Sequence, residues 1–253
     1  MNPTYVGLTV FGCSFAGFLL GTWLQDILPS HHLSAESRDT VKLGIGLIAT
    51  MTALVLGLVT ASAKSSFDDV DRTIKNVATD VLTLDRTLAR YGPETVEIRN
   101  GLQKAFAQRA EELWQPGHSR SSRLDPAGIV SRVEGLAHAI RALRPNDDAQ
   151  RGLQSRALDL SEGLLQARWL VSGIEGASIP LPFLAVLLFW LTIIFASFGL
   201  FAPRNALVLV ALFVCALSVG SAVFLVLELD APFDGLITIP EGPWRYVLMH
   251  LNK

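Results

Sequence analysis

Six residues between positions 46 and 64 lie on one helical face and could contact an ion. They repeat at intervals of 4, 3, 4, 3 and 4 residues, as one side of an α-helix requires, and they are Gly46, Thr50, Ala53, Gly57, Thr60 and Lys64. Small residues leave space beside the helix, and threonine hydroxyls can hydrogen-bond to a partly dehydrated ion. A lysine at the mouth of a pore favours anions. The pattern therefore predicts a pore wall, built from several copies of this face.

The same face can also be interpreted as a contact between two membrane helices. Small residues let helices approach closely in lipid, and Ala53, Gly57 and Ala61 have the spacing of such contacts. Lys64 has a simple explanation too, because lysines near the end of a span extend their amines toward the headgroups. The opposite side suits lipid or neighbouring helices, since it carries Leu43, Leu47, Met51, Leu54 and Leu58.

Three carboxylates near the end of the chain form a second candidate site. Glu228 lies at the end of the last apolar run, and Asp230 and Asp234 follow it on either side of the pair "PF". An ionisable group at membrane depth needs a partner, and Lys64 is the predicted partner of Glu228. The cluster could supply some of the oxygen ligands that calcium requires. Solvated carboxylates are the favoured interpretation, so neither a metal site nor a cofactor is predicted.

The composition is that of an integral membrane protein. Of 253 residues, 50% are hydrophobic and 17% are charged, whereas charged residues make up about 25% of soluble domains. Four runs reach the roughly 20 apolar residues that a spanning helix needs; they cover about 5–24, 43–63, 181–200 and 205–227.

The first run is not expected to be a signal peptide, because "MNPTY" contains no lysine or arginine. The net charge of −2 gives no reason to expect nucleic acid, and Cys13 and Cys215, each inside a predicted span, suggest neither a disulfide nor a zinc site.

The distribution of basic residues predicts the topology. We divide the chain into a first pair of spans (1–63), a polar domain (64–178), a second pair (179–229) and a tail (230–253). Of the 21 lysines and arginines, 16 lie in the polar domain and two in the tail. Only Arg38, Lys42 and Arg204 lie on the opposite side of the membrane. By the positive-inside rule, both termini and the polar domain face the cytoplasm, which places the protein in the inner membrane.

The polar domain is predicted to be a helical bundle. An apolar seam with heptad spacing runs through Phe67, Val70, Ile74, Val77, Val81, Leu84, Leu88 and Tyr91. It continues the small residues of the second span, so one helix is expected from about Ser34 to Arg90, with oligomer contacts along its whole length. Further helices are expected up to Trp114, from Ile129 to Leu143 and from Asp147 to Ile174, with a loop at 115–128. No strand-like alternation is present, so the fold class is all-α.

Two other segments have recognisable packing patterns. Gly17 and Gly21 form a GxxxG pair in the first span, which is typical of close helix packing. In the tail, Pro243 can open a short helix, with Trp244 and Tyr246 expected at the level of the lipid headgroups.

Four blocks of sequence resemble a bacterial family of bestrophin-like membrane proteins. They are "KLGIGLIATMTALVLGLVTASAKSSFD", "LDRTLARYGPET", "SFGLFAPRN" and "LELDAPFDGLI". The resemblance to bestrophins implies a pentameric anion channel with four spans per subunit. It also implies a helical cytoplasmic domain between spans two and three, and a pore lined by span two. The chain departs from the bestrophin pattern in two ways. The small face of span two has no phenylalanine for a hydrophobic neck, and the acidic calcium-binding run is reduced to Asp230 and Asp234.

Two functions are compatible with these patterns. The first is an anion-permeable homo-oligomeric channel, with five copies by resemblance, whose partners are the lipid bilayer and inorganic anions. The alternative is a non-conducting scaffold or sensor that uses the small face for packing and the polar domain to bind a partner. No catalytic motif can be identified, so an enzyme is not predicted.

The topology can be tested by labelling single cysteines in intact cells, after replacing Cys13 and Cys215 with alanine. A membrane-impermeant thiol reagent should label Ser37→Cys, in the connection between the first two spans. It should not label Ser121→Cys, in the polar domain, until the cells are permeabilised. The reverse pattern would show that the topology is inverted.

Overall fold

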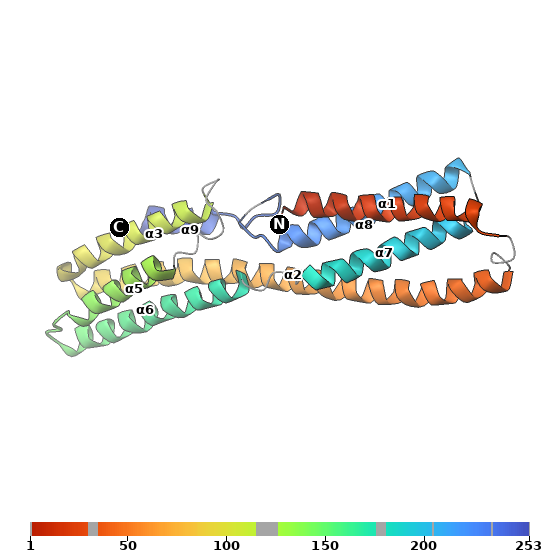
Figure 1. Ribbon diagram of the computed structural model, residues 1–253. Helices are drawn as coiled ribbons and strands as arrows, with labels where there is room; N and C mark the ends of the chain where they lie inside the picture. Colours follow the sequence, from red (N-terminus) through yellow and green to blue (C-terminus); the bar gives the residue numbers. More distant parts are fainter. Residues whose placement is uncertain are drawn as a thin grey trace. The chain divides into compact units, whose positions relative to one another are not determined.

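The computed structural model is mostly helical over the residues that it describes, which are 2–29, 35–114, 126–175, 181–203, 205–233 and 235–252. No strand occurs among them, and the all-α fold class is confirmed. In chain order the helices are α1 (Pro3–Ile27), α2 (Ala35–Tyr91), the 3-10 helix η2 (Pro93–Thr95), α3 (Val96–Trp114), α5 (Pro126–Arg141), α6 (Asp148–Glu175), α7 (Leu181–Phe201), α8 (Ala206–Leu229) and α9 (Gly242–His250) (Figure 1). Most of the predicted 115–128 loop lies outside the described residues.

Four of these helices are long and apolar enough to cross a membrane. They are α1, α2, α7 and α8, and each coincides with one predicted span to within a few residues at its apolar part. Of the most apolar 18-residue window, 33% is buried in α1 but only 6% in α2. The second span is therefore the one that the chain itself covers least.

The α2 helix is continuous for 57 residues, as the sequence predicts. At about 1.5 Å per residue it is roughly 85 Å long. Gly92 ends it with a φ of 145°, a left-handed conformation that favours glycine, and Pro93 opens η2. The buried hydroxyl of Thr95 lies 2.6 Å from the Leu88 carbonyl oxygen and 2.8 Å from that of Gly92. The single hydroxyl hydrogen can thus satisfy the Leu88 carbonyl, which the end of the helix leaves open.

The chain divides into two compact units. The first, here called the spanning unit, comprises Met1–Phe67 and Ser178–Leu236. The second, the polar unit, comprises Asp68–Ala177 and Ile237–Lys253. The α2 helix contributes to both, and the segment after α8 returns to the polar unit through α9.

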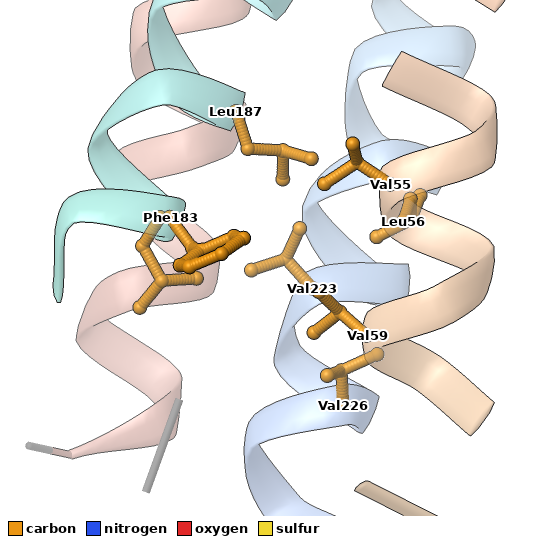
Figure 2. A pocket seen from close by; sticks show the side chains of 8 residues that line it. Val55, Leu56, Val59, Phe183, Leu187, Val223 and Val226 are labelled. Carbon is orange, nitrogen blue, oxygen red and sulfur yellow. The ribbon is translucent and has the colours of Figure 1, made fainter. Parts of the chain in front are cut away.

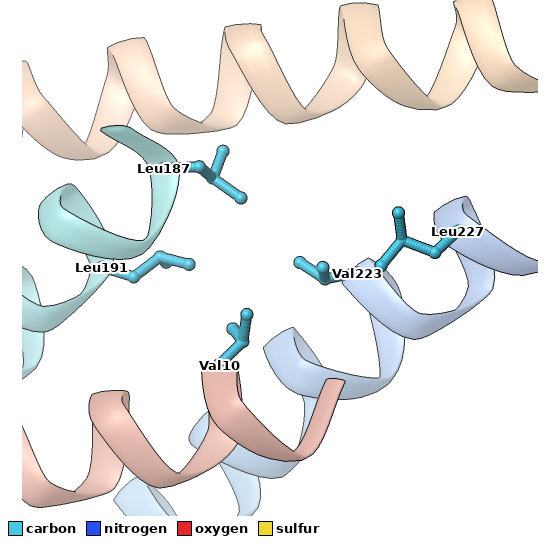
Figure 3. Close-up of a cluster of buried hydrophobic side chains, with 5 residues drawn as sticks. All are labelled: Val10, Leu187, Leu191, Val223 and Leu227. Carbon is cyan, nitrogen blue, oxygen red and sulfur yellow. The ribbon is translucent and has the colours of Figure 1, made fainter. Parts of the chain in front are cut away.

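In the spanning unit, α1 packs closely along α7 and α8 (Figure 1). Figure 3 shows Val10 of α1 facing Leu187 and Leu191 of α7 and Val223 and Leu227 of α8, all of them buried. A second cluster joins Phe18, Phe195 and Ala216.

Glycines make this close packing possible. A Cβ atom at Gly17 would lie 2.7 Å from the Thr192 carbonyl oxygen, and one at Gly21 would overlap the carbonyl oxygen of Ala196. Opposite them, a Cβ at Gly199 would overlap the Phe18 carbonyl oxygen. The predicted packing role of Gly17 and Gly21 is therefore confirmed, with α7 as the partner.

The polar unit buries the apolar seam of α2. Val70, Ile74, Val81, Leu84 and Leu88 are at most 4% exposed, and Val77 is half-buried. The predicted use of this seam as a contact between subunits is therefore wrong, because helices of the same chain already cover it.

A buried ion pair joins α2 to α3 in this unit. Arg99 donates hydrogen bonds to both carboxylate oxygens of Asp85, at 2.7 and 3.0 Å, and Asp85 is completely buried. These hydrogen bonds raise the pKa of Arg99 above its usual value, although burial acts in the opposite direction. Removing one partner would leave an uncompensated buried charge, so the pair fixes how α3 lies on α2.

The α9 helix is also part of the polar unit. The Trp244 ring stacks on Phe106 with centroids 4.0 Å apart, and its indole N–H donates to the Ile74 carbonyl oxygen at 3.1 Å. Trp114 similarly donates to the carbonyl oxygen of Ile239 at 3.0 Å. The prediction that Trp244 lies at the lipid headgroups is wrong, since its side chain is 3% exposed and packs inside the protein. Tyr246, by contrast, is exposed.

The packing of α1 against α7 predicts different effects for two glycine substitutions. Gly21→Ala places a methyl group against the Ala196 backbone and should lower the free energy of unfolding by about 1–3 kcal/mol. Gly44→Ala, on α2, meets no atom within 4 Å, so the higher helix propensity of alanine should leave stability equal or raise it by up to about 1 kcal/mol. Unfolding of the purified protein in detergent, followed by circular dichroism, measures both. Equal stability of the two variants would contradict the close approach of α1 and α7.

Candidate functional site

The part of α2 in the spanning unit has three different faces. One faces α7 and α8 of the same chain: Figure 2 shows Val55, Leu56 and Val59 opposite Phe183 and Leu187 of α7 and Val223 and Val226 of α8. Nothing polar lines the gap between these side chains. Its volume of about 10 Å³ is at the lower limit of what one water molecule needs. A water molecule there would find no hydrogen-bond partner, so this contact is dry.

The second face carries the large apolar side chains that the sequence assigns to lipid or to neighbouring helices. All of them are more than half exposed: Leu43, Leu47, Met51, Leu54 and Leu58. Among the residues that the structure describes, no helix covers this face.

The third face is the one with the candidate pore-lining residues. The structure brings all six together in one exposed row: Gly46, Thr50, Ala53, Gly57, Thr60 and Lys64. A Cβ atom added at Gly46 or Gly57 would meet nothing within 4 Å. The glycines of this face are therefore not used for packing within the chain, unlike Gly17 and Gly21 of α1.

The two threonines of this face already use their hydroxyl hydrogens. Thr50 donates to the Gly46 carbonyl oxygen at 2.8 Å, and Thr60 donates to that of Leu56 at 2.7 Å. Such bonds to the carbonyl four residues earlier are usual for threonine in helices. In this conformation the oxygen lone pairs, not the hydrogens, remain available, so donation from these hydroxyls to an ion stays a prediction. Each side chain would have to release its carbonyl before it could donate to an anion.

A second lysine, which sequence analysis did not include in the site, extends the same face. Lys42 precedes Gly46 by four residues and is exposed, with its amine 3.6 Å from the Asp39 carboxylate. Lys64 follows Lys42 by 22 positions, which correspond to about 33 Å of helix, close to the roughly 30 Å of bilayer hydrocarbon. The spacing signal that identified the other residues would also have found Lys42.

At the opposite end of the face, the Lys64 amine lies 5.6 Å from the centre of the Phe67 ring. This distance permits a cation–π contact. The predicted ion pair between Lys64 and Glu228 stays a prediction.

Glu228 instead organises the turn that follows α8. Glu228 is 4% exposed, and its carboxylate accepts a hydrogen bond from the Leu236 amide at 2.6 Å. Gly235 has a φ of 103°, and a Cβ atom there would overlap the same carboxylate. Asp230 is half-buried, whereas Asp234 lies outside the described residues. Among the described residues, no group of three or more His, Cys, Asp or Glu side chains could hold a metal ion.

Comparison with known protein families is consistent with this arrangement of helices. Residues 12–243 match the Bestrophin-like domain. The chain belongs to the Bestrophin-like family. This result confirms the resemblance found in the sequence, and the matched region includes nearly all of the four spanning helices of this Bestrophin-like protein.

Solved structures share its fold. Two crystal structures of point mutants of a bacterial bestrophin homologue from Klebsiella pneumoniae have TM-scores of 0.69 and 0.68 at 16% sequence identity. The matches cover 99% and 98% of this chain and 98% and 96% of those chains. A third structure of a bacterial bestrophin homologue from Klebsiella pneumoniae has a TM-score of 0.63, also at 16% identity, over 93% of this chain and 96% of that one. A comparison with curated protein sequences finds no match.

The turn around Glu228 predicts a stability difference between two glycines. Gly235→Ala forces a side chain into a left-handed conformation and against a buried carboxylate, which should lower the free energy of unfolding by about 1–3 kcal/mol. Gly242→Ala, at the start of α9, meets no atom within 4 Å and serves as the matched control. Thermal unfolding in detergent measures the difference. If both variants melt with the wild type, Glu228 does not hold this turn.

Proposed function

We propose that this Bestrophin-like protein is an oligomeric membrane channel, anion-permeable, with its pore lined by α2. The observation that carries the proposal is the exposed face from Gly46 to Lys64, which no helix in the described part of the chain covers. A helix needs no glycine to face lipid, and glycine in a helix costs about 0.5–1 kcal/mol relative to alanine. Contact with other copies around an aqueous path accounts for this composition.

Several copies are required, because one helical face cannot enclose a path. Within the described residues, only 6% of the most apolar window of α2 is buried. The rest of this span is open to other subunits or to lipid, which supports a homo-oligomer, and the resemblance to bestrophins suggests five copies.

The charges of this face support anion permeation. Lys42 and Lys64 lie at its two ends, and the sequence between them contains no charged residue. In an oligomer each lysine position would form a ring of positive charge at one mouth of the pore, which attracts anions and repels cations. In this proposal the hydroxyls of Thr50 and Thr60 donate hydrogen bonds to the passing anion after they rotate away from their carbonyl partners. The Lys64 end and both termini face the cytoplasm.

A non-conducting scaffold or sensor is the second candidate function. The same small face would then pack against another copy with no water between the helices, as small residues do in membrane helix pairs. The polar unit would bind a partner protein. This candidate shares the oligomer with the first one and differs in having no open path along α2.

Anion flux from proteoliposomes distinguishes the two candidates. The wild type should release trapped chloride faster than empty liposomes. Gly57→Trp should abolish this flux by filling the path, whereas Leu54→Trp, on the exposed leucine face, should conduct normally. Lys64→Glu should lower the anion-to-cation permeability ratio on the order of tenfold, because reversing one unit charge near the ion changes its energy by about 1–2 kcal/mol. Lys104→Glu, on the surface of α3, is the matched control and should leave the ratio unchanged.

Two results would contradict the proposal in different ways. If wild-type flux does not exceed that of empty liposomes, the protein is not a chloride channel and the scaffold is favoured. If flux is present but neither Gly57→Trp nor Lys64→Glu changes it, α2 does not line the pore.

A further inference from the structure

The turn that follows α8 presents one large apolar side chain outward. Leu236 is 82% exposed, the highest value among the large apolar side chains of the described residues. Pro232 before it and Ile239 after it are both buried. The chain is therefore held against the protein on either side of Leu236, while Leu236 itself protrudes.

The Glu228 carboxylate fixes the position of Leu236. It accepts the hydrogen bond from the Leu236 amide at 2.6 Å, and Gly235, with a φ of 103°, allows the chain to reverse at this point. Glu228 is 4% exposed, and a buried carboxylate is costly unless it is hydrogen-bonded. The bond that satisfies Glu228 thus keeps the leucine exposed instead of letting the turn fold it inward.

The level of Leu236 follows from the length of α8, one of the four helices that are apolar enough to span a membrane. This helix has 24 residues, which corresponds to about 36 Å and exceeds the roughly 30 Å of bilayer hydrocarbon. Glu228 is in its last turn, one residue from the end at Leu229. The Leu236 amide, bound to Glu228, is therefore at the boundary between hydrocarbon and headgroups.

We propose that Leu236 is a membrane anchor, whose side chain inserts between lipids next to their headgroups and holds the turn after α8 at the bilayer surface. A leucine exposed on a water-facing loop is common and needs no explanation. At the end of a spanning helix the same side chain has acyl chains within reach, and its burial there removes apolar surface from water.

A lipid surface fits this side chain better than a second copy of the chain does. Between α8 and α9, Leu236 is the single large apolar side chain that is exposed among the described residues. Its exposed neighbours Gly235, Thr238 and Pro240 are small or polar. A subunit interface buries a continuous patch of about 800 Å² on each partner, whereas lipid chains can rearrange around one leucine. The proposed channel is not required for this inference, which uses no residue of α2.

A spin label at position 236 tests the anchor in the full chain. Leu236→Cys is labelled in a protein whose Cys13 and Cys215 are replaced with alanine, and the protein is reconstituted in phosphatidylcholine liposomes. Power saturation in electron paramagnetic resonance compares the access of oxygen, which concentrates in lipid, with that of a water-soluble nickel chelate. The label should be more accessible to oxygen than to the chelate.

Two other labelled positions calibrate this measurement. Leu217→Cys, exposed near the middle of α8, should also be more accessible to oxygen. Lys104→Cys, exposed on α3 of the polar unit, should be more accessible to the nickel chelate. The sign of the difference in accessibility at position 236 should therefore match Leu217→Cys and oppose Lys104→Cys.

A second pair of variants, made in the labelled Leu236→Cys chain, tests whether Glu228 positions the anchor. Glu228→Ala removes the acceptor of the Leu236 amide, so the label should become more mobile and shift toward access by the nickel chelate. Glu228→Gln keeps a carbonyl acceptor and should keep the preference for oxygen. Melting temperatures in detergent confirm that each variant is folded. Should Glu228→Ala not fold, the label at position 236 in the otherwise unchanged chain still decides whether the anchor exists.

Three outcomes would overturn the proposal. Greater access of the nickel chelate than of oxygen at position 236 places the side chain in water. Poor access of both reagents, together with dipolar broadening between labels, shows that a second copy covers Leu236. An oxygen preference that is unchanged in Glu228→Ala shows that Glu228 does not position the anchor.

Discussion

The structure depends on a change of solvent along one uninterrupted helix. In water, burying apolar surface drives association, and the α2 seam from Val70 to Leu88 is made of large apolar side chains, most of which are buried in the polar unit. In lipid this driving force is absent, and close packing of small residues takes its place. The face of α2 from Gly46 to Thr60 accordingly carries small side chains, and these side chains are exposed. The apolar seam of α2 is thus buried by its own chain in the polar unit, whereas its small-residue face is exposed in the spanning unit.

Glycine has two separate uses in the spanning helices. At Gly17, Gly21 and Gly199 the absence of a side chain allows α1 and α7 to approach within backbone contact distance. At Gly44, Gly46 and Gly57 the same absence leaves open space. The first group explains how α1, α7 and α8 form a stable core around Val10, Leu191 and Val223, against which Val55 and Leu56 of α2 also pack. The second group explains why α2 remains available for contacts that a single chain does not make.

Hydrogen bonds from buried polar groups shape the segment after α8. Glu228 receives the Leu236 amide, Trp114 donates to Ile239, and Trp244 donates to Ile74. Each bond satisfies a buried group that would otherwise be costly, and each lies inside its own unit. Together these bonds determine where the chain leaves the last span and where α9 packs. The non-helical segment between α8 and α9 therefore has a defined path.

The sequence alone determined the elements of this protein. Runs of about 20 apolar residues predicted the four spans. Apolar periodicity predicted the long α2 helix as far as about Arg90, because a helical face must repeat every three or four residues. The same periodicity placed Gly46, Thr50, Ala53, Gly57, Thr60 and Lys64 on one face. Only the tertiary structure decided which faces are covered. Coverage of the α2 seam and of Trp244 depends on helices distant in sequence, and small residues have the same spacing whether they pack or remain open. The directions of the Thr50 and Thr60 hydroxyls and the partner of Glu228 were also decided there, because hydrogen bonds depend on distances of a few ångströms that spacing along the chain does not specify.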